Sequence, residues 1–425
     1  MNPTSRPFLR LWAVTGSANL ADGILLAGLP VVATTITTDP GAVAAVTTIF
    51  LSSMGLAALP SGVLADRGDR RRIIIATNIV RTACLVGLVA ISAVVGVHIA
   101  VIFAAAAVCG STEVVNDVAA ETAVPELVAP NRLMRAHGRL ATTQVVMNDG
   151  IGAPIGGVLG ALGIAWVLGA PGLLYALGAV LVAPLALRRP TRRHRSTGPT
   201  PITDVREGIR ALRGDLLLRR MAVAAAFMNL ANTAFFAVAV LLVIGPMQLP
   251  RSAYGLILGA FAVGGIVGGA MAERVVSLIG ESGVLRLGPV VIGATYGTAC
   301  AIPHPAVAVP ALTVLSASAM TWTVTTRVLR QRRVPEHLLG RVSVTIRLVA
   351  LCTAPVGGAL AGAVAATWGV RSVGVVTAIA AALALALLWN APVDGSGPSG
   401  IAADEVAGRP RGSSTQPADP IDTRS

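Results

Sequence analysis

The stretch Gly62-Val63-Leu64-Ala65-Asp66-Arg67-Gly68-Asp69-Arg70-Arg71-Arg72 is a short, basic segment between two long apolar runs. Each run has about 20 residues, the length that a helix needs to cross the hydrocarbon core of a bilayer. Inside a bilayer every backbone polar group must be satisfied within the protein, so such runs form helices even when they are rich in β-branched residues. The stretch therefore predicts a tight turn between two membrane-crossing helices.

The composition of the whole chain agrees with a membrane protein. Of 425 residues, 54% are hydrophobic and 12% are charged, which is about half the charged share of soluble domains and excludes the soluble, disordered, coiled-coil and disulfide-framework classes. Twelve apolar runs are long enough to cross a bilayer, at about 11–36, 43–64, 73–95, 99–121, 136–159, 164–187, 221–244, 254–272, 286–302, 306–328, 342–365 and 372–389.

The basic residues predict the orientation of these helices. The chain has 33 basic residues and a formal net charge of +13, and all 33 are arginines because lysine does not occur. The two ends and the loops on one side of the predicted bundle hold 29 of them, whereas the loops on the other side hold only Arg251 and Arg371. The positive-inside rule therefore predicts a multi-pass protein of the cytoplasmic membrane with both termini in the cytoplasm. This distribution makes the lipid bilayer the expected partner and excludes nucleic acid.

The two halves of the chain resemble each other at four places in the same order. Asn19-Leu20-Ala21-Asp22 recurs as Asn229-Leu230-Ala231-Asn232, and Ala153-Pro154-Ile155-Gly156-Gly157 recurs as Ala354-Pro355-Val356-Gly357-Gly358. The other two matches pair 62–67 with 269–274 and 124–126 with 334–336. The repeat predicts an all-α membrane protein with twelve transmembrane helices in two six-helix bundles. The bundles are related by pseudo-twofold symmetry, and a site is expected between them near the midplane.

Four parts of the chain follow from this repeat. We expect an N-terminal bundle over 1–187, a cytoplasmic linker over 188–220, a C-terminal bundle over 221–389 and a disordered cytoplasmic tail over 390–425. The second part of the linker is predicted to be an amphipathic helix at the membrane surface, capped by Asp204. Its apolar stripe consists of Ile202, Val205, Ile209, Leu212 and Leu216.

The stretch 62–72 resembles the signature loop of the major facilitator superfamily, which reads Gly-x-Leu-x-Asp-Arg-x-Gly followed by two basic residues. This resemblance implies the major facilitator fold, secondary transport and a monomeric state. It also implies that Asp66 lies at the N-terminal end of the eleventh span, where the helix dipole favours an anion. We expect Asp117 to be the partner of the arginines at 70–72. The predicted cytoplasmic gate consists of Gly62, Asp66, Arg67, Gly68, Arg70, Arg71 and Asp117.

A narrower resemblance covers 109–160, which is similar to actinobacterial drug exporters of the macrolide-efflux type, with siderophore exporters as close relatives. It rests on the segments 109–120 and 131–140 and on an antiporter motif, Gly-x-x-x-Gly-Pro-x-x-Gly-Gly, that maps onto 148–157. Within that motif Gly152, Gly156 and Gly157 fit, whereas Asn148 and Ala153 replace the first Gly and the Pro. The resemblance implies export in exchange for protons.

Small residues in the fifth and eleventh spans predict close helix packing. Glycines four residues apart let two backbones approach, and a proline inside a span removes one hydrogen bond and allows a bend. Plain packing and a role in rocking are both compatible with this pattern. The residues concerned are Gly152, Pro154, Gly156, Gly157, Pro355, Gly357 and Gly358.

Charged groups at membrane depth cost at least about 2.5–3.5 kcal/mol, so each one needs a reason. Asp22, in the middle of the first span, and Glu113, deep in the fourth, are the expected proton carriers, because burial of a carboxyl group disfavours its charged form. A purely structural, hydrogen-bonded Asp22 remains the alternative. Arg81 and Arg347 are expected to snorkel to the cytoplasm or to join the gate. The predicted proton and substrate pathway comprises Asp22, Asn19, Glu113, Gln144, Asn148, Asp149, Asn229 and Asn232.

The chain contains neither a nucleotide-binding loop, which requires lysine, nor a metal-type cluster or nucleophile arrangement. We therefore expect no enzyme activity and no cofactor. The hypothesis is a secondary transporter that exports small amphipathic molecules in exchange for protons. The alternatives are an uptake permease or a siderophore exporter of the same fold, and a non-transporting membrane receptor or assembly protein.

Overall fold

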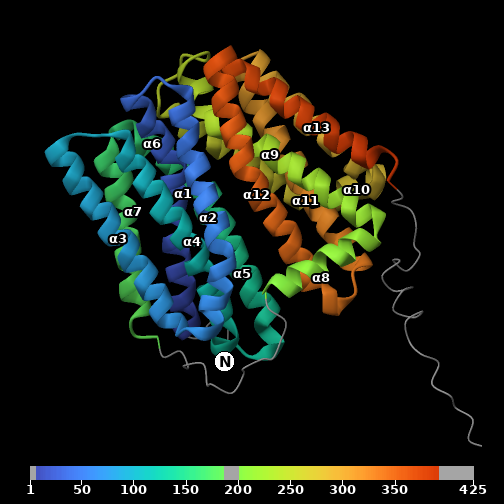
Figure 1. Cartoon of the computed structure of the whole chain (residues 1–425), viewed down its shortest axis with the longest axis horizontal. Helices are drawn as coiled ribbons and strands as arrows, with labels where there is room; N and C mark the ends of the chain where they lie inside the picture. Colours follow the sequence, from blue (N-terminus) through green and yellow to red (C-terminus); the bar gives the residue numbers. More distant parts are fainter. Residues whose placement is uncertain (1–5, 186–200, 392–425) are drawn as a thin grey trace, which may run out of the picture.

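The computed structural model describes residues 6–185 and 201–391, and those residues form helices joined by short turns (Figure 1). The helices of the first half are α1 (Arg6–Ile36), α2 (Pro40–Arg67), α3 (Arg70–Val95), α4 (Ile99–Leu127), η1 (Pro130–Arg132), α5 (Leu133–Val145), η2 (Val146–Gly152), α6 (Ala153–Leu162) and α7 (Ile164–Val182). Those of the second half are α8 (Pro201–Gly214), α9 (Leu216–Ile244), α10 (Ala253–Ala301), α11 (Pro305–Arg333), α12 (Glu336–Trp368), η3 (Val370–Ser372) and α13 (Val373–Trp389).

The predicted twelve crossings are all present in this order. In the described residues, 11 helices are long and apolar enough to cross a membrane. The longest, α10, contains two crossings joined at Gly280, whose φ of 73° breaks the helix. The segments α5, η2 and α6 together form the fifth crossing, over residues 130–162. The prediction of an all-α protein with twelve membrane helices in two bundles is therefore confirmed.

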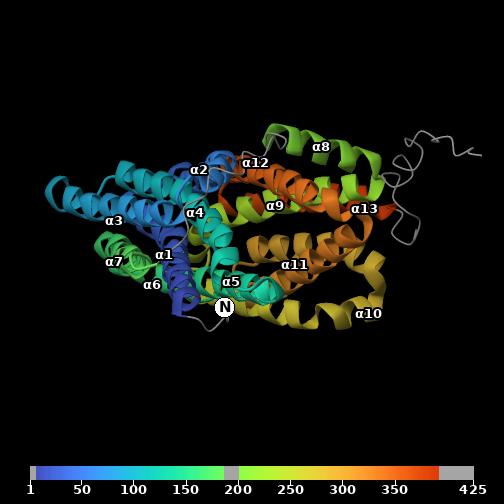
Figure 2. The ribbon, with the colours of Figure 1, turned by 90° about the horizontal axis from the view of Figure 1, so that it is seen from below.

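The two bundles lie side by side, α1–α7 in one and α9–α13 in the other (Figure 2). We call the end that holds the start of α1 and the turn at 68–69 the proximal end. The distal end holds the turns at 37–39 and 245–252. In Figure 1, α2 and α12 approach each other at the top, which is distal, and diverge toward the bottom.

The basic stretch that predicted the fold forms the tight turn between α2 and α3. Gly68 ends α2, and a Cβ there would lie 2.7 Å from the carbonyl oxygen of Leu64 and 2.8 Å from Ile73. Asp69 then caps α3, because its Oδ1 accepts hydrogen bonds from the backbone N–H groups of Arg71 at 3.1 Å and Arg72 at 3.3 Å. A cap of this kind satisfies the free N–H groups at a helix start, which gives Asp69 a structural role at the position where the signature loop has its second glycine.

The distal ends of the bundles are closed against each other by small residues. Gly157 of α6 lies so close to Gly255 of α10 that a Cβ on either glycine would overlap backbone atoms of the other half. On the other side of the molecule, Gly358 of α12 packs against Thr48 of α2, where a Cβ would overlap the threonine side chain. Arg251 adds a hydrogen bond from Nε to Thr34 Oγ1 at 3.2 Å. The halves therefore meet at their distal ends.

The linker differs in part from its prediction. Helix α8 begins at Pro201 rather than at a cap formed by Asp204, and it ends before Asp215. Asp215 caps α9 by accepting from the N–H group of Leu218 at 3.0 Å, so Leu216 belongs to α9 and the seventh crossing starts earlier than 221. Residues 186–200 and 392–425, which hold the rest of the linker and the tail, lie outside the described residues.

Helix α8 packs on the C-terminal bundle rather than lying free. Gly208 contacts the backbone of Arg341 in α12, and Glu207 forms an ion pair with the Arg341 side chain. Ala211 and Leu212 are buried with residues of α9 and α12 in one apolar cluster. The arginines of α8 at 206, 210 and 213 are exposed.

Candidate functional site

A cavity of about 340 Å³ lies between the two bundles. Its walls come from α1, α2, η2 and α6 on one side and from α9, α10 and α12 on the other. Most of its lining is apolar and includes three aromatic side chains. The polar residues that line it are Thr47, Asp149, Asn229, Asn232 and Thr233. This cavity is where the repeat predicts a site, between the bundles and near mid-membrane.

Asp149 reaches the cavity from an irregular turn in the fifth crossing. Residues 146–152 form a π-helix, in which the N–H group of Ala153 bonds to the carbonyl of Asn148, five residues back. Pro154 has no N–H group and so cannot continue the α-helical pattern at this point. Such π turns occur often at functional sites. This one presents Asp149, an exposed side chain, to the cavity.

The polar patch that the sequence predicts on the fifth crossing is divided by this π turn. Gln144 points to the fourth crossing, where its Nε2 donates to Asp117 Oδ2 at 2.7 Å. The backbone of Asn148 packs against Gly23 of α1 so closely that a Cβ on Gly23 would overlap it. Of the three predicted residues, only Asp149 lines the cavity.

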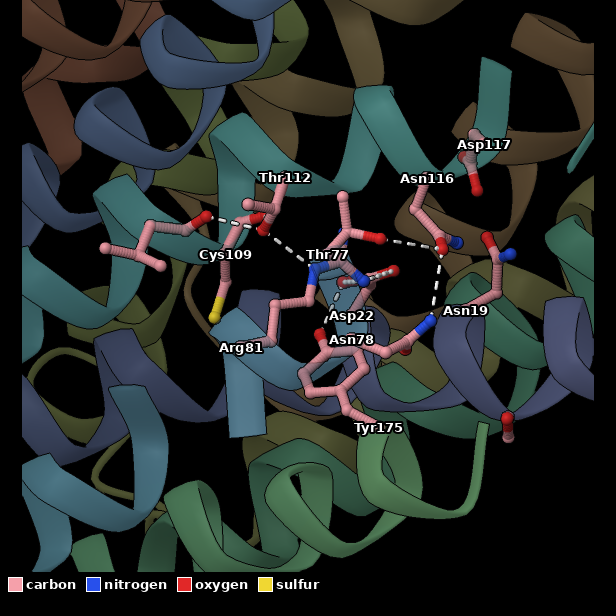
Figure 3. Close-up of polar contacts among 12 residues, drawn as sticks. Asn19, Asp22, Thr77, Asn78, Arg81, Cys109, Thr112, Asn116, Asp117 and Tyr175 are labelled. Atoms are coloured by element: carbon pink, nitrogen blue, oxygen red, sulfur yellow. Dashed lines mark hydrogen bonds and ion pairs between the residues drawn. The ribbon is translucent and has the colours of Figure 1, made fainter. Parts of the chain in front are cut away.

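A buried polar network lies inside the N-terminal bundle, centred on Asp22 (Figure 3). Asp22 Oδ1 lies 3.3 Å from Arg81 Nη1 and accepts a hydrogen bond of 2.5 Å from the Tyr175 hydroxyl. The side chains of Asp22 and Arg81 are both 0% exposed. The Arg81 guanidinium carbon also lies 4.7 Å from the centroid of the Tyr175 ring, which is a cation–π distance.

One expectation about these residues is wrong. Arg81 does not snorkel to the surface, because it is the largest fully buried side chain in the described residues. Asp22 has both a counter-charge and a hydroxyl donor. Its role as a proton carrier stays a prediction. Arg347 has no described side chain.

The network continues from α3 into α4. Arg81 Nε donates to Thr112 Oγ1 at 2.8 Å, and Asn78 Nδ2 donates to Asn116 Oδ1 at 3.2 Å. Asn19 is turned to its own helix, where it donates to the carbonyl of Thr15 at 2.9 Å. The network thus ties α1, α3, α4 and α7 together at mid-membrane depth.

Several buried atoms of this network have no hydrogen bond in the described part of the chain. Among them are Arg81 Nη2, on a cationic side chain, and Glu113 Oε2, on an acidic one. Glu113 follows Thr112 on α4 and is 5% exposed. It lies within the electrostatic range of Arg81 and of Asp22. A buried carboxyl group without an ionic partner is costly in its charged form.

The C-terminal bundle holds a neutral counterpart of the ion pair. Asn232, which matches Asp22 in the repeat, accepts a hydrogen bond of 2.8 Å from the Tyr296 hydroxyl. Asp22 and Arg81 join the first and third crossings of their half, and Asn232 and Tyr296 join the first and third crossings of theirs. The second predicted amide, Asn229, donates to the carbonyl of Ala350 at 2.6 Å. Only the first half carries charge at this position.

Two arginines of the predicted gate have described partners other than the expected one. Arg70 pairs with Glu126, nine residues beyond Asp117 on α4, and Arg71 donates to the carbonyl of Ala183. The expectation that Asp117 is the partner of Arg70 is therefore wrong for this conformation. The side chains of Asp66 and Arg67 lie outside the described residues, and a Cβ on Gly62 would meet no neighbour within 4 Å.

The predicted packing glycines lie at close helix contacts. Gly152 and Gly156 face α1, where a Cβ would overlap the backbone near Leu20 and Ile24. In the second half, Gly357 packs against Leu230 and Thr233 of α9, and it follows Pro355 in α12. These positions allow the first and fifth, and the seventh and eleventh, crossings to approach closely.

Sequence reasoning missed Tyr175, Glu126, Tyr296 and the role of Arg81. A signal for Arg81 was available, because a charged side chain this deep needs a partner and Asp22 was the acid at the same depth. The tyrosines gave no such signal, since a tyrosine inside a span is also an ordinary apolar residue.

Comparisons with known proteins agree with this architecture. The family model described as Major Facilitator Superfamily matches residues 11–350. A crystal structure of a bacterial homologue of the human lysosomal transporter Spinster, inward-facing and unoccupied, superposes with a TM-score of 0.68 at 16% identity, covering 92% of this chain and 98% of that one. No curated protein sequence matches the chain.

Two further solved structures resemble the chain to a similar degree. A variant of the nucleoside transporter NupG gives a TM-score of 0.71 at 12% identity and covers 91% of this chain and 98% of its own. An inward-facing bacterial homologue of the iron transporter ferroportin gives 0.68 at 18% identity, with 90% and 98% covered. With the family model spanning most of the sequence, the chain belongs to the major facilitator superfamily.

Proposed function

We propose that this chain is a secondary active transporter that exports small amphipathic molecules in exchange for protons by alternating access. The observation that carries the proposal is the central cavity, whose walls come from both bundles while their distal ends are closed by Gly157 and Gly255 and by Thr48 and Gly358. A site between two bodies that meet at one end becomes accessible from the other side when the bodies rock.

The direction of opening follows from the arginines. Their distribution favours a cytoplasmic proximal end by the positive-inside rule, and with that orientation the described conformation faces inward. Export then begins with a ligand entering from the cytoplasm or the inner leaflet. The resemblance of 109–160 to macrolide-efflux exporters favours export over uptake, and the predicted location is the cytoplasmic membrane with both termini inside.

The buried network supports proton coupling. Arg81 lies 3.3 Å from Asp22, while its Nη2 and Glu113 Oε2 have no hydrogen bond in the described residues. A proton on Asp22 removes the charge that holds Arg81, and the freed guanidinium then pairs with Glu113. Because Asp22 and Tyr175 lie on α1 and α7 and Glu113 on α4, such an exchange shifts helices within the N-terminal bundle.

The test is transport in proteoliposomes with an imposed proton gradient. We expect amphipathic dyes or drugs to accumulate in the compartment that the distal end of the protein faces. An uncoupler should abolish this accumulation. Accumulation in the opposite direction with the same gradient would support the uptake permease, and export restricted to iron-chelating compounds would support the siderophore exporter.

A non-transporting receptor or assembly protein is the alternative of another class. It predicts ligand binding without any flux of substrate or protons across the bilayer. Flux that is absent for a broad panel, from liposomes in which the protein is folded and correctly inserted, would overturn the proposal.

A further inference from the structure

We infer that the ligand of the central cavity is a small monovalent organic cation with an apolar body, and that Asp149 is its counter-ion. This inference rests on the proposed function only in taking the cavity between the bundles as the transport site. It names a class of substrate where the proposed function names only amphipathic molecules.

Charge is the first argument. Asp149 is the one ionisable acid among the described residues that line the cavity, and no arginine or histidine lines it. Its side chain is exposed toward the cavity, and in the described part of the chain no ion pair or side-chain hydrogen bond is formed by its carboxylate. Asp22, by contrast, has Arg81. A carboxylate at this depth needs a positive partner, and for Asp149 the described side chains supply none.

The aromatic wall opposite Asp149 is the second argument. Phe236 of α9 and Phe261 of α10 are in edge-to-face contact, with ring centroids 4.9 Å apart and planes at 77°. Both line the cavity together with Tyr254. The face of an aromatic ring carries partial negative charge and attracts ammonium groups. A cation between a carboxylate and these rings is stabilised from two sides.

The remaining polar groups argue against anionic ligands. Asn229 donates to the carbonyl of Ala350 at 2.6 Å, Asn232 accepts from the Tyr296 hydroxyl at 2.8 Å, and both side chains are uncharged. An anion would therefore meet a carboxylate and no positive side chain among the described lining residues. The volume of about 340 Å³ lies at the small end of the range for ligand pockets, which limits the ligand to a compact molecule.

The experiment uses the purified full-length protein and benzyltrimethylammonium as the probe. Its two competitors are neopentylbenzene, which has the same shape without the charge, and phenylmethanesulfonate, which has a similar size and the opposite charge. Radiolabelled benzyltrimethylammonium is expected to bind saturably and to be displaced by unlabelled cation, but not by either competitor. Equal displacement by the neutral compound would overturn the assignment of charge.

Variants test whether the Asp149 carboxylate and the aromatic rings bind the cation. Asp149→Asn should weaken binding of the cation by at least about tenfold, and Asp149→Glu should retain most of it. Phe236→Leu should weaken binding by about fivefold, as expected for the loss of one cation–π contact. Glu121→Gln, which removes an exposed carboxylate of α4, is the matched control and should bind like the wild type. Thermal unfolding midpoints identify any variant that is simply misfolded.

Failure of this inference is distinct from failure of the proposed function. Proton-driven transport of neutral compounds, with benzyltrimethylammonium neither bound nor transported, would contradict the cation assignment. The same result would still support the proposed transport function. Asp149-dependent binding of the cation without any coupled flux would support the cation assignment and contradict the proposed transport function. Unchanged binding in Asp149→Asn would show that another group holds the charge and would also overturn the inference.

Discussion

The Tyr175 hydroxyl donates a 2.5 Å hydrogen bond to Oδ1 of Asp22, the same oxygen that lies 3.3 Å from Arg81. The tyrosine ring also lies under the Arg81 guanidinium. Tyr175 therefore contacts both members of the ion pair, through its oxygen on one and its ring on the other. This arrangement makes it possible to separate the energetic effect of the hydroxyl group from that of the ring.

Tyr175→Phe should destabilise the protein more than Tyr296→Phe. The first removes a hydrogen bond to a charged group, worth about 1.5–3 kcal/mol, and the second removes one between neutral groups, worth about 0.5–1.5 kcal/mol. Both tyrosines are buried, so each is the other's control for the loss of a buried hydroxyl group. The free energy of unfolding in mixed detergent measures the difference. Equal losses would contradict the described role of the charge on Asp22.

In a Glu113→Gln background, Asp22→Asn should be strongly destabilising, by about 3–5 kcal/mol, because neither acid is then left to balance the buried charge of Arg81. The double variant Asp22→Asn with Arg81→Met should regain much of that loss, since no uncompensated charge remains. Thermal unfolding of the two single variants and the double variant closes a double-mutant cycle. Additive losses would mean that the two side chains do not interact in the folded protein.

Glu113→Gln should abolish proton-driven accumulation while leaving substrate exchange without a gradient within about twofold of the wild type. The amide cannot take up and release a proton, but it fills the same space. Counterflow and gradient-driven uptake in the same proteoliposomes provide the two readouts. Glu121→Gln, an exposed position on the same helix, should retain both activities. Full proton coupling in Glu113→Gln would remove this residue from the proposed exchange.

Gly157→Leu should prevent distal closure, because a side chain there would overlap the backbone of Gly255. We expect the conformational equilibrium to shift toward the outward-open state, with export reduced by at least tenfold. Alkylation of a reporter, Ala27→Cys in the cavity wall, by an impermeant reagent from the distal side measures the shift. Gly87→Leu is the matched control, since a Cβ at Gly87 has no neighbour within 4 Å. Unchanged distal access in Gly157→Leu would argue against closure at this contact.

Glu126→Gln should lower stability by about 1 kcal/mol or less, because the pair with Arg70 is partly exposed to solvent and such pairs contribute little. Its expected effect is on conformation, by loosening the proximal end of α3 from α4. The comparison is Glu281→Gln, which breaks the more exposed pair with Arg332 in the other bundle. Proximal access to Ala27→Cys should change in the first variant and not in the second.

The twelve crossings and the twofold repeat were predictable because both rest on patterns that the bilayer imposes on sequence. The length of the apolar runs predicts the crossings. Four short sequence matches in the same order predict the repeat. The orientation that the arginines predict and the roles of the pathway residues remain predictions. The partner predicted for Arg70 was wrong. Asp117 and Glu126 are nine residues apart on one helix, and spacing alone does not tell which of them lies at the depth of Arg70.

The buried network could be predicted only in part. Asp22 stood out by its depth, but its pairing with Arg81 depends on how α1 and α3 are placed side by side, and an arginine can reach several positions along a helix. The seventh crossing was placed too late because the apolar stripe of the linker runs on into α9. Asp215, an ordinary capping residue, marks the boundary between them.

The π turn at 146–152 changes how the fifth crossing should be numbered around its axis. A wide turn holds one residue more than an α-turn, and each residue of an α-helix advances by about 100°. A helical wheel drawn through the whole crossing is therefore out of phase beyond Gly152 by that amount. Any cysteine scan or periodicity analysis that treats 133–162 as one regular helix will assign the residues after the π turn to the wrong face. The segments before and after the π turn must be indexed separately.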